Sequence, residues 1–408
     1  MILRPFKAVI PRRDIVKLVS SPPYDILEYE EVENILKENP YSFLRITRSE
    51  VEIGMRNNPH DEKVYRRAKE NFEKFLRDGI LIEDERERLF IYSLKFQGRI
   101  QRGIVATFSV DEYDSGRIKK HELTREDKEL DRVGHISTVG AQTGPVYLFY
   151  RSIDAVKEIL RNITDETEPL FSFETDGVFN EVHTVDEENI KKLVDIFKDV
   201  DSFYIADGHH RAAGASKVRR LKMKENPNHT GEEEYNYFLG VLFPHDELRI
   251  LPYNRSIKSE ITEEEFLRNS REFFDIDPID GFKEPSKGEF IVTHKWKRWW
   301  HMRFKGYDES VDDPLRNLDT FILQEYVLER IFGVENPRKD PRLKFVGGTN
   351  HFENMERIIR SGEYDYGFFL HPTSIEDIMK ISDAGKIMPP KSTWFEPKLR
   401  SGLFIHPI

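Results

Sequence analysis

The feature that most constrains the fold is an alternation of two hydrophobic spacings along most of the chain. Apolar residues spaced two apart are typical of a β-strand with one buried face, and a spacing near 3.6 is typical of an amphipathic helix. A chain that carries both patterns throughout is predicted to be a mixed α/β protein, neither a pure helical bundle nor a β-sandwich.

The two spacings predict individual elements. Strands are expected at Leu89–Phe96, Gly103–Val110, Pro145–Tyr150, Ser202–Ala206, Tyr237–Phe243, Glu289–Thr293 and Tyr366–Leu370. Helices are expected at Glu30–Lys37, Asp61–Leu76, Ile153–Ile163, Asp186–Phe197, Thr262–Phe273 and Leu318–Ile331. Thr262 followed by Glu265 forms a capping-box pattern, so the start of that helix is the best defined.

The length of 408 residues predicts more than one lobe, because a single hydrophobic core usually stops growing at roughly 250 to 300 residues. Polar, turn-rich stretches at Glu50–His60, Lys224–Glu234 and Asn336–Asn350 are interpreted as surface loops or lobe boundaries. We expect an N-terminal α/β lobe over residues 1–150, a core segment over 151–275, and a C-terminal α/β segment over 276–408 that completes a cleft.

Composition excludes several classes of chemistry. The chain has no cysteine, which excludes disulfides, Cys-ligated metals and a Cys nucleophile. No apolar run approaches the ~18 residues that span a bilayer, and the N-terminus lacks a signal-peptide pattern, so a cytoplasmic protein with no membrane partner is expected. The net charge of −11 argues against nucleic acid as a partner. Charged residues make up 34% of the chain, which fits a heat-adapted source.

The most informative local segment runs from Ser202 to Ala215, where an apolar strand leads into Asp-Gly-His-His-Arg and then an Ala-rich helix. Backbone N–H groups at a helix start favour an anion. Two imidazoles and the Arg211 guanidinium add charge-assisted donors, and Gly208 allows close approach of a ligand. The segment therefore predicts a phosphate-binding turn. The structural alternative is that Asp207 only caps the helix while the histidines pack or face solvent.

This Asp207–Arg211 box resembles the phosphate-binding box of ParB-like proteins and of the small free serine kinases built on that fold. Over nearly the whole chain, the sequence also resembles a large prokaryotic family listed as a domain of unknown function. The further segments that carry the resemblance are Ser21–Asp25, Phe43–Arg45, His121–Thr124 with Lys128 and Asp131–Arg132, Leu251–Arg255, and Met388–Thr393 with Pro397–Lys398.

The resemblance implies a ParB/sulfiredoxin-like core within a two-lobed protein. It also implies free L-serine as phosphate acceptor, O-phospho-L-serine as product, and pyrophosphate as donor in some members, a reaction that supplies cysteine biosynthesis. In the small serine kinases a glutamate near the N-terminus is the general base, but the equivalent position here is not fixed by the sequence. The chain has no Walker loop and no G-x-G-x-x-G motif, which favours a small donor over ADP or ATP.

Phosphoryl transfer requires positioning, charge neutralisation and a group that accepts the hydroxyl proton. The candidates for catalysis are Asp25, Glu122, Asp207, His209, His210 and Arg211. The candidates for binding serine or phosphate are Arg45, His121, Thr124, Lys128, Arg132, Gly208, Arg255, Lys391, Ser392, Thr393 and Lys398. A Mg²⁺ ion is expected, with Asp207 and Glu122 as its carboxylate ligands.

Several candidates have plain structural alternatives. Asp25 follows two prolines and would otherwise cap the next helix, and Glu122 would otherwise lie on an exposed helix within the charged run Gly116–Arg132. Lys391–Thr393 follows Pro389-Pro390 and would otherwise be an ordinary loop. Trp394 and Phe395 are interpreted as core residues.

Two other functions remain open from the sequence. A ParB-like box also occurs in nucleotide-binding regulatory modules associated with DNA, but no basic face or helix-turn-helix is evident here. A phosphoserine phosphatase would use the same pocket with water as nucleophile. The metal, the donor and homo-oligomer formation are not determined by the sequence.

Overall fold

A computed structural model of the chain describes residues 1–308, 310 and 313–408. Its contacts divide the chain into two units that are discontinuous in sequence. Unit 1 consists of Met1–Lys120, Thr124–Leu248 and Pro397–Ile408, and unit 2 consists of His121–Leu123 and Arg249–Glu396. These units do not follow the three consecutive segments expected from the sequence, because the chain returns to unit 1 after it has built unit 2.

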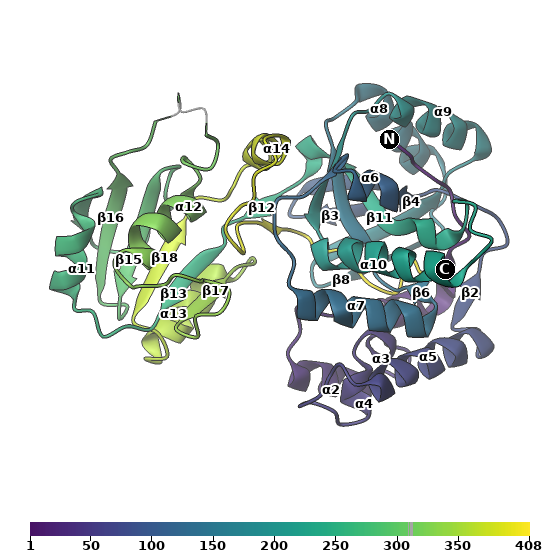
Figure 1. Cartoon of the computed structure of the whole chain (residues 1–408), viewed down its shortest axis with the longest axis horizontal. Helices are drawn as coiled ribbons and strands as arrows, with labels where there is room; N and C mark the ends of the chain where they lie inside the picture. The colour runs from purple at the N-terminus through teal and green to yellow at the C-terminus, as the bar shows by residue number, and fades with distance from the viewer. Residues whose placement is uncertain (309, 311–312) are drawn as a thin grey trace. The chain divides into compact units, whose positions relative to one another are not determined.

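Unit 1 contains an eight-stranded mixed sheet with the order β5-β10-β7-β11-β4-β3-β9-β8 (Figure 1). The pairs β11–β7 and β10–β5 are parallel, and the other neighbours are antiparallel. The strands are β3 (Phe90–Phe96), β4 (Arg99–Ser109), β5 (Ile118–Lys119), β7 (Val146–Tyr150), β8 (Phe171–Thr175), β9 (Val178–Thr184), β10 (Phe203–Asp207) and β11 (Tyr237–Pro244). Two small ladders join β1 (Val9–Pro11) to β2 (Leu81–Glu83) and β6 (Ala141–Gln142) to β20 (His406–Pro407).

The helices of unit 1 surround this sheet, and α7 lies beside α10 (Figure 1). Aspartates cap two of the predicted helices: Asp61 accepts a hydrogen bond at the start of α5, and Asp186 does so at the start of α9. The longer helices are α2 (Tyr29–Glu38), α5 (Glu62–Arg77), α7 (Glu126–Val139), α8 (Asp154–Glu166), α9 (Glu187–Lys198) and α10 (His209–Glu225). The short ones are α1 (Val16–Val19), α3 (Leu44–Thr47), α4 (Ser49–Glu52) and α6 (Val110–Asp114).

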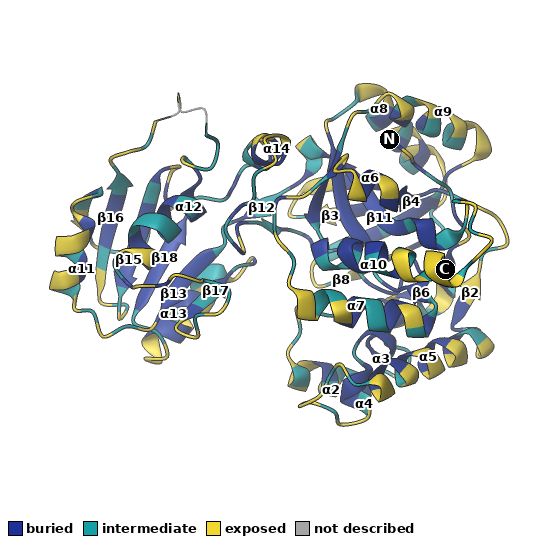
Figure 2. Ribbon diagram, in the orientation of Figure 1, coloured by how far each residue is buried: buried dark blue, intermediate teal, exposed yellow. Residues whose placement is uncertain are grey.

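The sheet of unit 1 is buried while the outer faces of its helices are exposed, as the colouring of Figure 2 shows. Ile104, Leu148 and Ile205 come from β4, β7 and β10 of this sheet and have no exposed surface. Complete burial of a side chain of this size stabilises the fold by about 1.5 to 3 kcal/mol. The apolar central strands therefore fix β10, and with it the turn that follows Asp207.

Unit 2 is built on a six-stranded sheet with the order β14-β16-β15-β18-β13-β17, in which every pair of neighbours is antiparallel. The strands are β13 (Asn254–Ile257), β14 (Phe274–Ile279), β15 (Glu289–His294), β16 (Arg298–Phe304), β17 (Leu343–Val346) and β18 (Tyr366–Leu370). A further short ladder joins β12 (Ile250–Leu251) to β19 (Trp394–Phe395).

Both faces of this sheet are packed. In β15, Phe290 and Val292 belong to one apolar cluster with residues of α11 (Glu263–Ser270) and α12 (Asp319–Leu323). Ile291, between them in sequence, belongs to a second cluster with residues of α13 (His351–Arg360). This alternation is the expected consequence of successive strand residues pointing to opposite faces. The remaining helix of unit 2 is α14 (Ile375–Asp383).

The mixed α/β prediction is confirmed, and every predicted strand and helix has a counterpart. Thr262 caps α11, where its hydroxyl accepts a hydrogen bond from the Glu265 backbone at 3.3 Å. Two details differ. The stretch Asn336–Asn350, interpreted as a surface loop or lobe boundary, contains the four-residue strand β17. The helix expected to begin at Leu318 continues from α12 as a π-helical segment, Gln324–Glu329.

The charged run Gly116–Arg132 is not one solvated helix. The short strand β5 occupies its beginning, and α7 starts only at Glu126. Asp131 and Arg132 on α7 are buried. Across the residues that the structure describes, no helix combines the length and apolar character needed to cross a membrane.

Candidate functional site

The Asp207–Arg211 box forms the predicted turn between β10 and α10. Gly208 is the N-cap of the 17-residue helix and has φ of +93°, a conformation that side-chain-bearing residues rarely adopt. A Cβ atom at this position would lie 2.9 Å from Nε of Arg211. The Gly208 backbone N–H donates to Oδ1 of Asp207 at 2.8 Å. The Arg211 guanidinium therefore packs against Gly208 at the start of its own helix.

Two cations surround the other oxygen of Asp207. Lys398 Nζ lies 3.3 Å from Oδ2, and Arg211 Nη2 lies 3.9 Å from it. Arg211 also donates to the carbonyl oxygen of Pro145. Lys398 reaches the box from the C-terminal segment that returns to unit 1. The structure thus places three of the predicted site residues together at one helix N-terminus, with a net positive charge.

The two histidines of the box occupy different environments. His209 is buried at 7% exposure, whereas His210 lies at intermediate depth. The backbone N–H of Arg125 donates to Nε2 of His210 at 3.1 Å, so Nδ1 carries the proton in a neutral ring. His210 therefore links the box to the segment that precedes α7. In the same segment, the hydroxyl of Thr124 hydrogen bonds to Glu129.

A small pocket, partly open to solvent, lies beside the box in unit 1. Arg211 on α10 and Arg132 on α7 both line this pocket, although the two candidates are 79 residues apart in sequence. None of its lining residues, among those that the structure describes, is a carboxylate. The lining residues are Pro23, Tyr24, Thr47, Arg132, His135, Ile136, Gln142, Thr143, Gly144, Val146, Arg211 and Ser401.

Arg132 is held at this pocket by a buried network. Its Nη2 and Nε lie 2.5 and 3.0 Å from Oδ2 of Asp131, and its guanidinium carbon lies 3.9 Å from the centre of the Tyr24 ring. Asp131 Oδ1 accepts from the Tyr65 hydroxyl at 2.9 Å and lies 2.7 Å from His60 Nδ1. Burial alone would raise the pKa of Asp131, but the Arg132 charge and these hydrogen bonds lower that pKa to about 2.

His135 is a pocket residue that the sequence analysis missed. Its Nε2 lies 3.0 Å from the carbonyl oxygen of Ile46, so Nε2 donates and Nδ1 is an acceptor. Burial, together with the charge of Arg132, lowers the pKa of His135 to about 4. The ring is therefore neutral at ordinary pH. The available signal was its position three residues after Arg132, which places both side chains on one face of α7.

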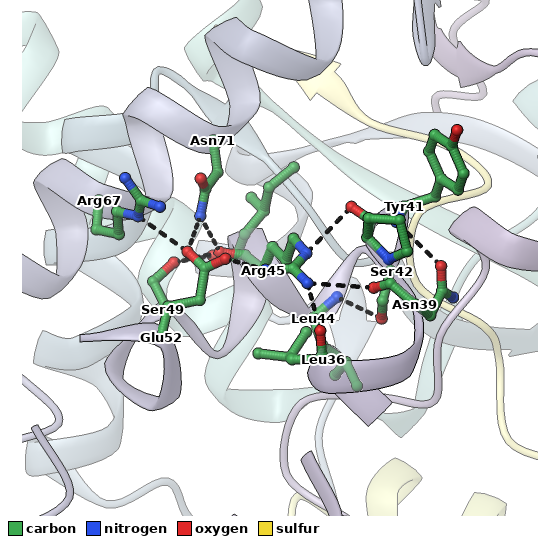
Figure 3. A network of polar contacts seen from close by, with 12 residues as sticks. Leu36, Asn39, Tyr41, Ser42, Leu44, Arg45, Ser49, Glu52, Arg67 and Asn71 are labelled. Atoms are coloured by element: carbon green, nitrogen blue, oxygen red, sulfur yellow. Dashed lines mark hydrogen bonds and ion pairs between the residues drawn. The ribbon is translucent and has the colours of Figure 1, made fainter. Parts of the chain in front are cut away.

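Arg45 is used within the fold of unit 1 (Figure 3). Its guanidinium forms an ion pair with Glu52 and donates to the carbonyl oxygens of Leu36, Pro40 and Asn39. Glu52 also accepts hydrogen bonds from Arg67 and Asn71 at 2.9 and 2.7 Å. Arg45 does not line the pocket.

The other candidates of unit 1 are more exposed. Asp25 is exposed in the turn before α2, and Glu28 rather than Asp25 is the N-cap of that helix. Tyr24, next to Asp25, lines the pocket, and burial raises the pKa of its hydroxyl. Lys128 lies on α7 at intermediate depth.

The remaining candidates gather in unit 2. Arg255 on β13 is 2% exposed, and its Nη2 donates to the carbonyl oxygens of Pro390 and Lys391 at 3.1 and 3.0 Å. His121 Nε2 lies 3.3 Å from the hydroxyl of Thr393, and the His121 carbonyl accepts from Met388 at 2.8 Å. Glu122 follows His121 in a bend and not on a helix, which corrects the exposed-helix interpretation.

The two carboxylates proposed as Mg²⁺ ligands lie in different units, Asp207 in unit 1 and Glu122 in unit 2. No cluster of three or more His, Asp or Glu side chains suited to a metal occurs among residues 1–308, 310 and 313–408. Mg²⁺ is commonly held by one or two carboxylates, water and substrate phosphates. Oδ1 of Asp207 already accepts from the Gly208 backbone and Oδ2 faces Lys398, so the assignment of Asp207 and Glu122 to a Mg²⁺ ion stays a prediction.

Comparison with known proteins identifies the family. A model of the family described as "Protein of unknown function (DUF1015)" matches residues 3–321, so the chain belongs to that family. No curated protein matches the sequence.

Several solved structures are similar to this chain. A free serine kinase in complex with AMP is 14% identical, with a TM-score of 0.38, covering 71% of this chain and 86% of that one. A conserved hypothetical protein from Pyrococcus furiosus is 13% identical, with a TM-score of 0.37 and coverage of 72% and 92%. A C-terminally truncated SbnI from Staphylococcus aureus is 9% identical, with a TM-score of 0.38 and coverage of 72% and 84%.

Proposed function

We propose that this protein is a phosphotransferase that converts free L-serine to O-phospho-L-serine with a small phosphate donor. Pyrophosphate is the first candidate for the donor, and ADP and ATP are the alternatives. The observation that carries the proposal is the helix N-terminus at Gly208, with Arg211 and Lys398 beside it and Arg132 across the adjoining pocket. The acceptor is proposed from the sequence resemblance to free serine kinases.

The charge of the pocket favours a small anion. The Arg132 and Arg211 side chains are only 8% and 14% exposed, and none of the described residues that line the pocket is acidic. Charge-assisted hydrogen bonds to phosphate are stronger where water is excluded, and they can neutralise the charge that spreads over the transferred group. A donor bound here would place its oxygens at the Gly208 turn and the two guanidinium groups.

The acceptor hydroxyl needs a base at the moment of attack. In the proposed step, the serine oxygen forms a bond to phosphorus while the bond from phosphorus to the leaving phosphate oxygen breaks, and the hydroxyl proton passes to a carboxylate. Asp25 is our candidate because it adjoins Tyr24, which lines the pocket. Mg²⁺, when bound with the donor, would neutralise phosphate charge.

The test is an assay of purified protein with L-serine and each of pyrophosphate, ADP and ATP, in the presence of Mg²⁺, with O-phosphoserine followed by mass spectrometry. Formation of O-phosphoserine with at least one donor is expected. No product with any of the three would defeat the kinase proposal and favour a regulatory binding module. Release of phosphate from O-phosphoserine alone would favour the phosphatase.

The variant Arg211→Ala tests the location of the site. It should raise the donor KM or lower turnover by about 10- to 100-fold, because it removes charge-assisted hydrogen bonds worth roughly 1.5 to 3 kcal/mol each. Arg220→Ala is the matched control, since Arg220 lies on the same helix with a side chain 61% exposed. Equal kinetics for the two variants would show that the donor binds elsewhere.

A further inference from the structure

His135 brings an unsatisfied hydrogen-bond acceptor to the pocket of unit 1. The residue lines the pocket and is 3% exposed. A carbonyl oxygen can only accept, so the contact of Nε2 with Ile46 fixes the proton of the neutral ring on Nε2. Nδ1 is buried, and no group in the described parts of the chain hydrogen bonds to it. A buried polar atom without a partner is uncommon and costly, so Nδ1 is the nitrogen left for a ligand of this pocket.

The charged groups around His135 restrict what such a ligand can be. Arg132 and Arg211 line the same pocket, and none of the described lining residues is acidic. Arg132 lies about one helical turn before His135 on α7. Burial, together with the charge of Arg132, lowers the pKa of His135 to about 4, so the ring stays neutral. These cations repel an ammonium group and attract an anion. The pocket therefore suits an anion that also carries a hydrogen for Nδ1.

The other neutral polar side chains of the lining do not select for that hydrogen. The lining has hydroxyl groups on Tyr24, Thr47, Thr143 and Ser401. A hydroxyl can rotate either to donate or to accept, so these groups suit any oxyanion. The side-chain amide of Gln142 is engaged with main-chain groups of β11, at 3.0 Å through its nitrogen and 2.6 Å through its oxygen. Nδ1 of the neutral imidazole, in contrast, can only accept.

Oxyanions of similar shape and charge differ in whether they carry a hydrogen. At neutral pH, inorganic phosphate keeps at least one P–OH group, whereas sulfate carries no hydrogen. Guanidinium groups can donate to the oxygens of either anion. The P–OH group of phosphate can donate to Nδ1, but a sulfate oxygen would meet the Nδ1 lone pair and leave it unsatisfied. A singly protonated pyrophosphate has the same P–OH group.

We propose that His135 makes this pocket selective for a phosphate group that carries a P–OH hydrogen, over oxyanions without one. The P–OH group donates to Nδ1 of His135, while the other oxygens accept from Arg132 and Arg211. His135 is thus a specificity-determining residue for the donor and takes no proton from the acceptor hydroxyl. The inference rests on the proposed function, in which the phosphate donor occupies this pocket.

The test is calorimetric titration of the purified full chain with inorganic phosphate and with sulfate, at neutral pH, constant ionic strength and without added metal. Phosphate should bind about 10- to 100-fold more tightly, because sulfate leaves a buried acceptor unpaired. Fluorophosphate is a third probe, since it has the shape and charge of hydrogen phosphate but no hydrogen. It should bind as weakly as sulfate. This comparison of ligands needs no variant and so does not depend on one that folds.

Two substitutions separate the nitrogens of the ring. His135→Gln can keep a donor to Ile46 but has no acceptor where Nδ1 lies, so its ratio of phosphate to sulfate affinity should fall to near one. His135→Asn can place its amide oxygen where Nδ1 lies, and part of the ratio should return. Arg211→Ala is the matched control, because a guanidinium does not distinguish the two anions. It should weaken both and preserve the ratio.

Equal affinity of the wild-type protein for phosphate, fluorophosphate and sulfate would overturn the inference, and so would no binding of any of them. An unchanged ratio in folded His135→Gln, or a ratio that disappears in Arg211→Ala, would also overturn it. The proposed function is judged separately by the O-phosphoserine assay. Selective phosphate binding without O-phosphoserine would defeat only the proposed function, and O-phosphoserine formation without selectivity would defeat only the role of His135.

Discussion

Each unit of the protein contains a buried aspartate, and the two titrate in opposite directions. Asp131 in unit 1 is 6% exposed and Asp319 in unit 2 is 5% exposed. Burial acts to raise both pKa values. The charge and hydrogen bonds of Arg132 reverse this effect for Asp131 and lower its pKa to about 2, whereas the pKa of Asp319 rises to about 7.

The difference in pKa follows from the groups that surround each buried carboxylate. Asp131 accepts from Arg132 and from the Tyr65 hydroxyl, with His60 at 2.7 Å. Asp319 accepts at Oδ1 from the Gly288 backbone at 2.9 Å, but no hydrogen bond reaches its Oδ2 within the described parts of the chain. Although the two aspartates are buried to a similar extent, Asp131 forms an ion pair in unit 1, whereas Asp319 is an acid that titrates near neutral pH in unit 2.

The largest expected effect is the loss of the Asp131 charge. Asp131→Asn leaves the Arg132 guanidinium buried without its counterion, and breaking a buried pair in this way costs about 3 to 5 kcal/mol. The free energy of unfolding, measured by urea denaturation, should fall by that amount. Asp127→Asn is the control, because Asp127 pairs with Arg125 on the exposed face of the same helix. A loss no larger than the control's would contradict the comparison.

The next largest effect is expected at Asp319, in the dependence of the free energy of unfolding on pH. Its folded-state pKa of about 7 lies above the usual 3.8, so the folded state holds a proton that the unfolded state releases. Its contribution to stability is therefore complete below pH 4 and is lost as the pH rises from about 4 to 7, up to about 4 kcal/mol. Denaturation at a series of pH values should show this loss, and Asp319→Asn should flatten it.

The contribution of Asp131 to stability changes with pH in the opposite direction. Its lowered pKa means that its contribution is complete above pH 4 and is lost as the pH falls from about 4 to 2. Asp131→Asn should remove this acid-dependent loss and leave the loss between pH 4 and 7 in place. A single shared pH profile for the two variants would show that the aspartates do not differ as described.

A smaller effect is expected at the turn that places Arg211. Gly208→Ala adds a left-handed backbone cost of about 1 to 2 kcal/mol and a Cβ atom 2.9 Å from Arg211 Nε. Gly231→Ala is a matched control, since Gly231 has φ of +96° with nothing within 4 Å of an added Cβ. The two variants should lose similar stability. Only Gly208→Ala should also raise the donor KM, because it displaces the guanidinium.

The sequence by itself determined the mixed α/β class, the main strands and the turn at Gly208. These features depend on residues close in the chain: a continuous run of apolar side chains defines β10, and a glycine before a helix allows a positive φ. Local patterns also identified Arg132 and Arg211 as candidates. They did not show that both line one pocket.

Only the tertiary structure decided which distant residues meet. Lys398 reaches Asp207 because the C-terminal segment returns to unit 1, and within unit 2 the Thr373 hydroxyl donates to the carbonyl oxygen of Ser392. The same holds for the two aspartates, whose pKa values depend on whether packing brings a cation to the buried carboxylate. Spacing in sequence specifies backbone conformation, whereas burial and charge pairing arise from long-range contacts that no local pattern encodes.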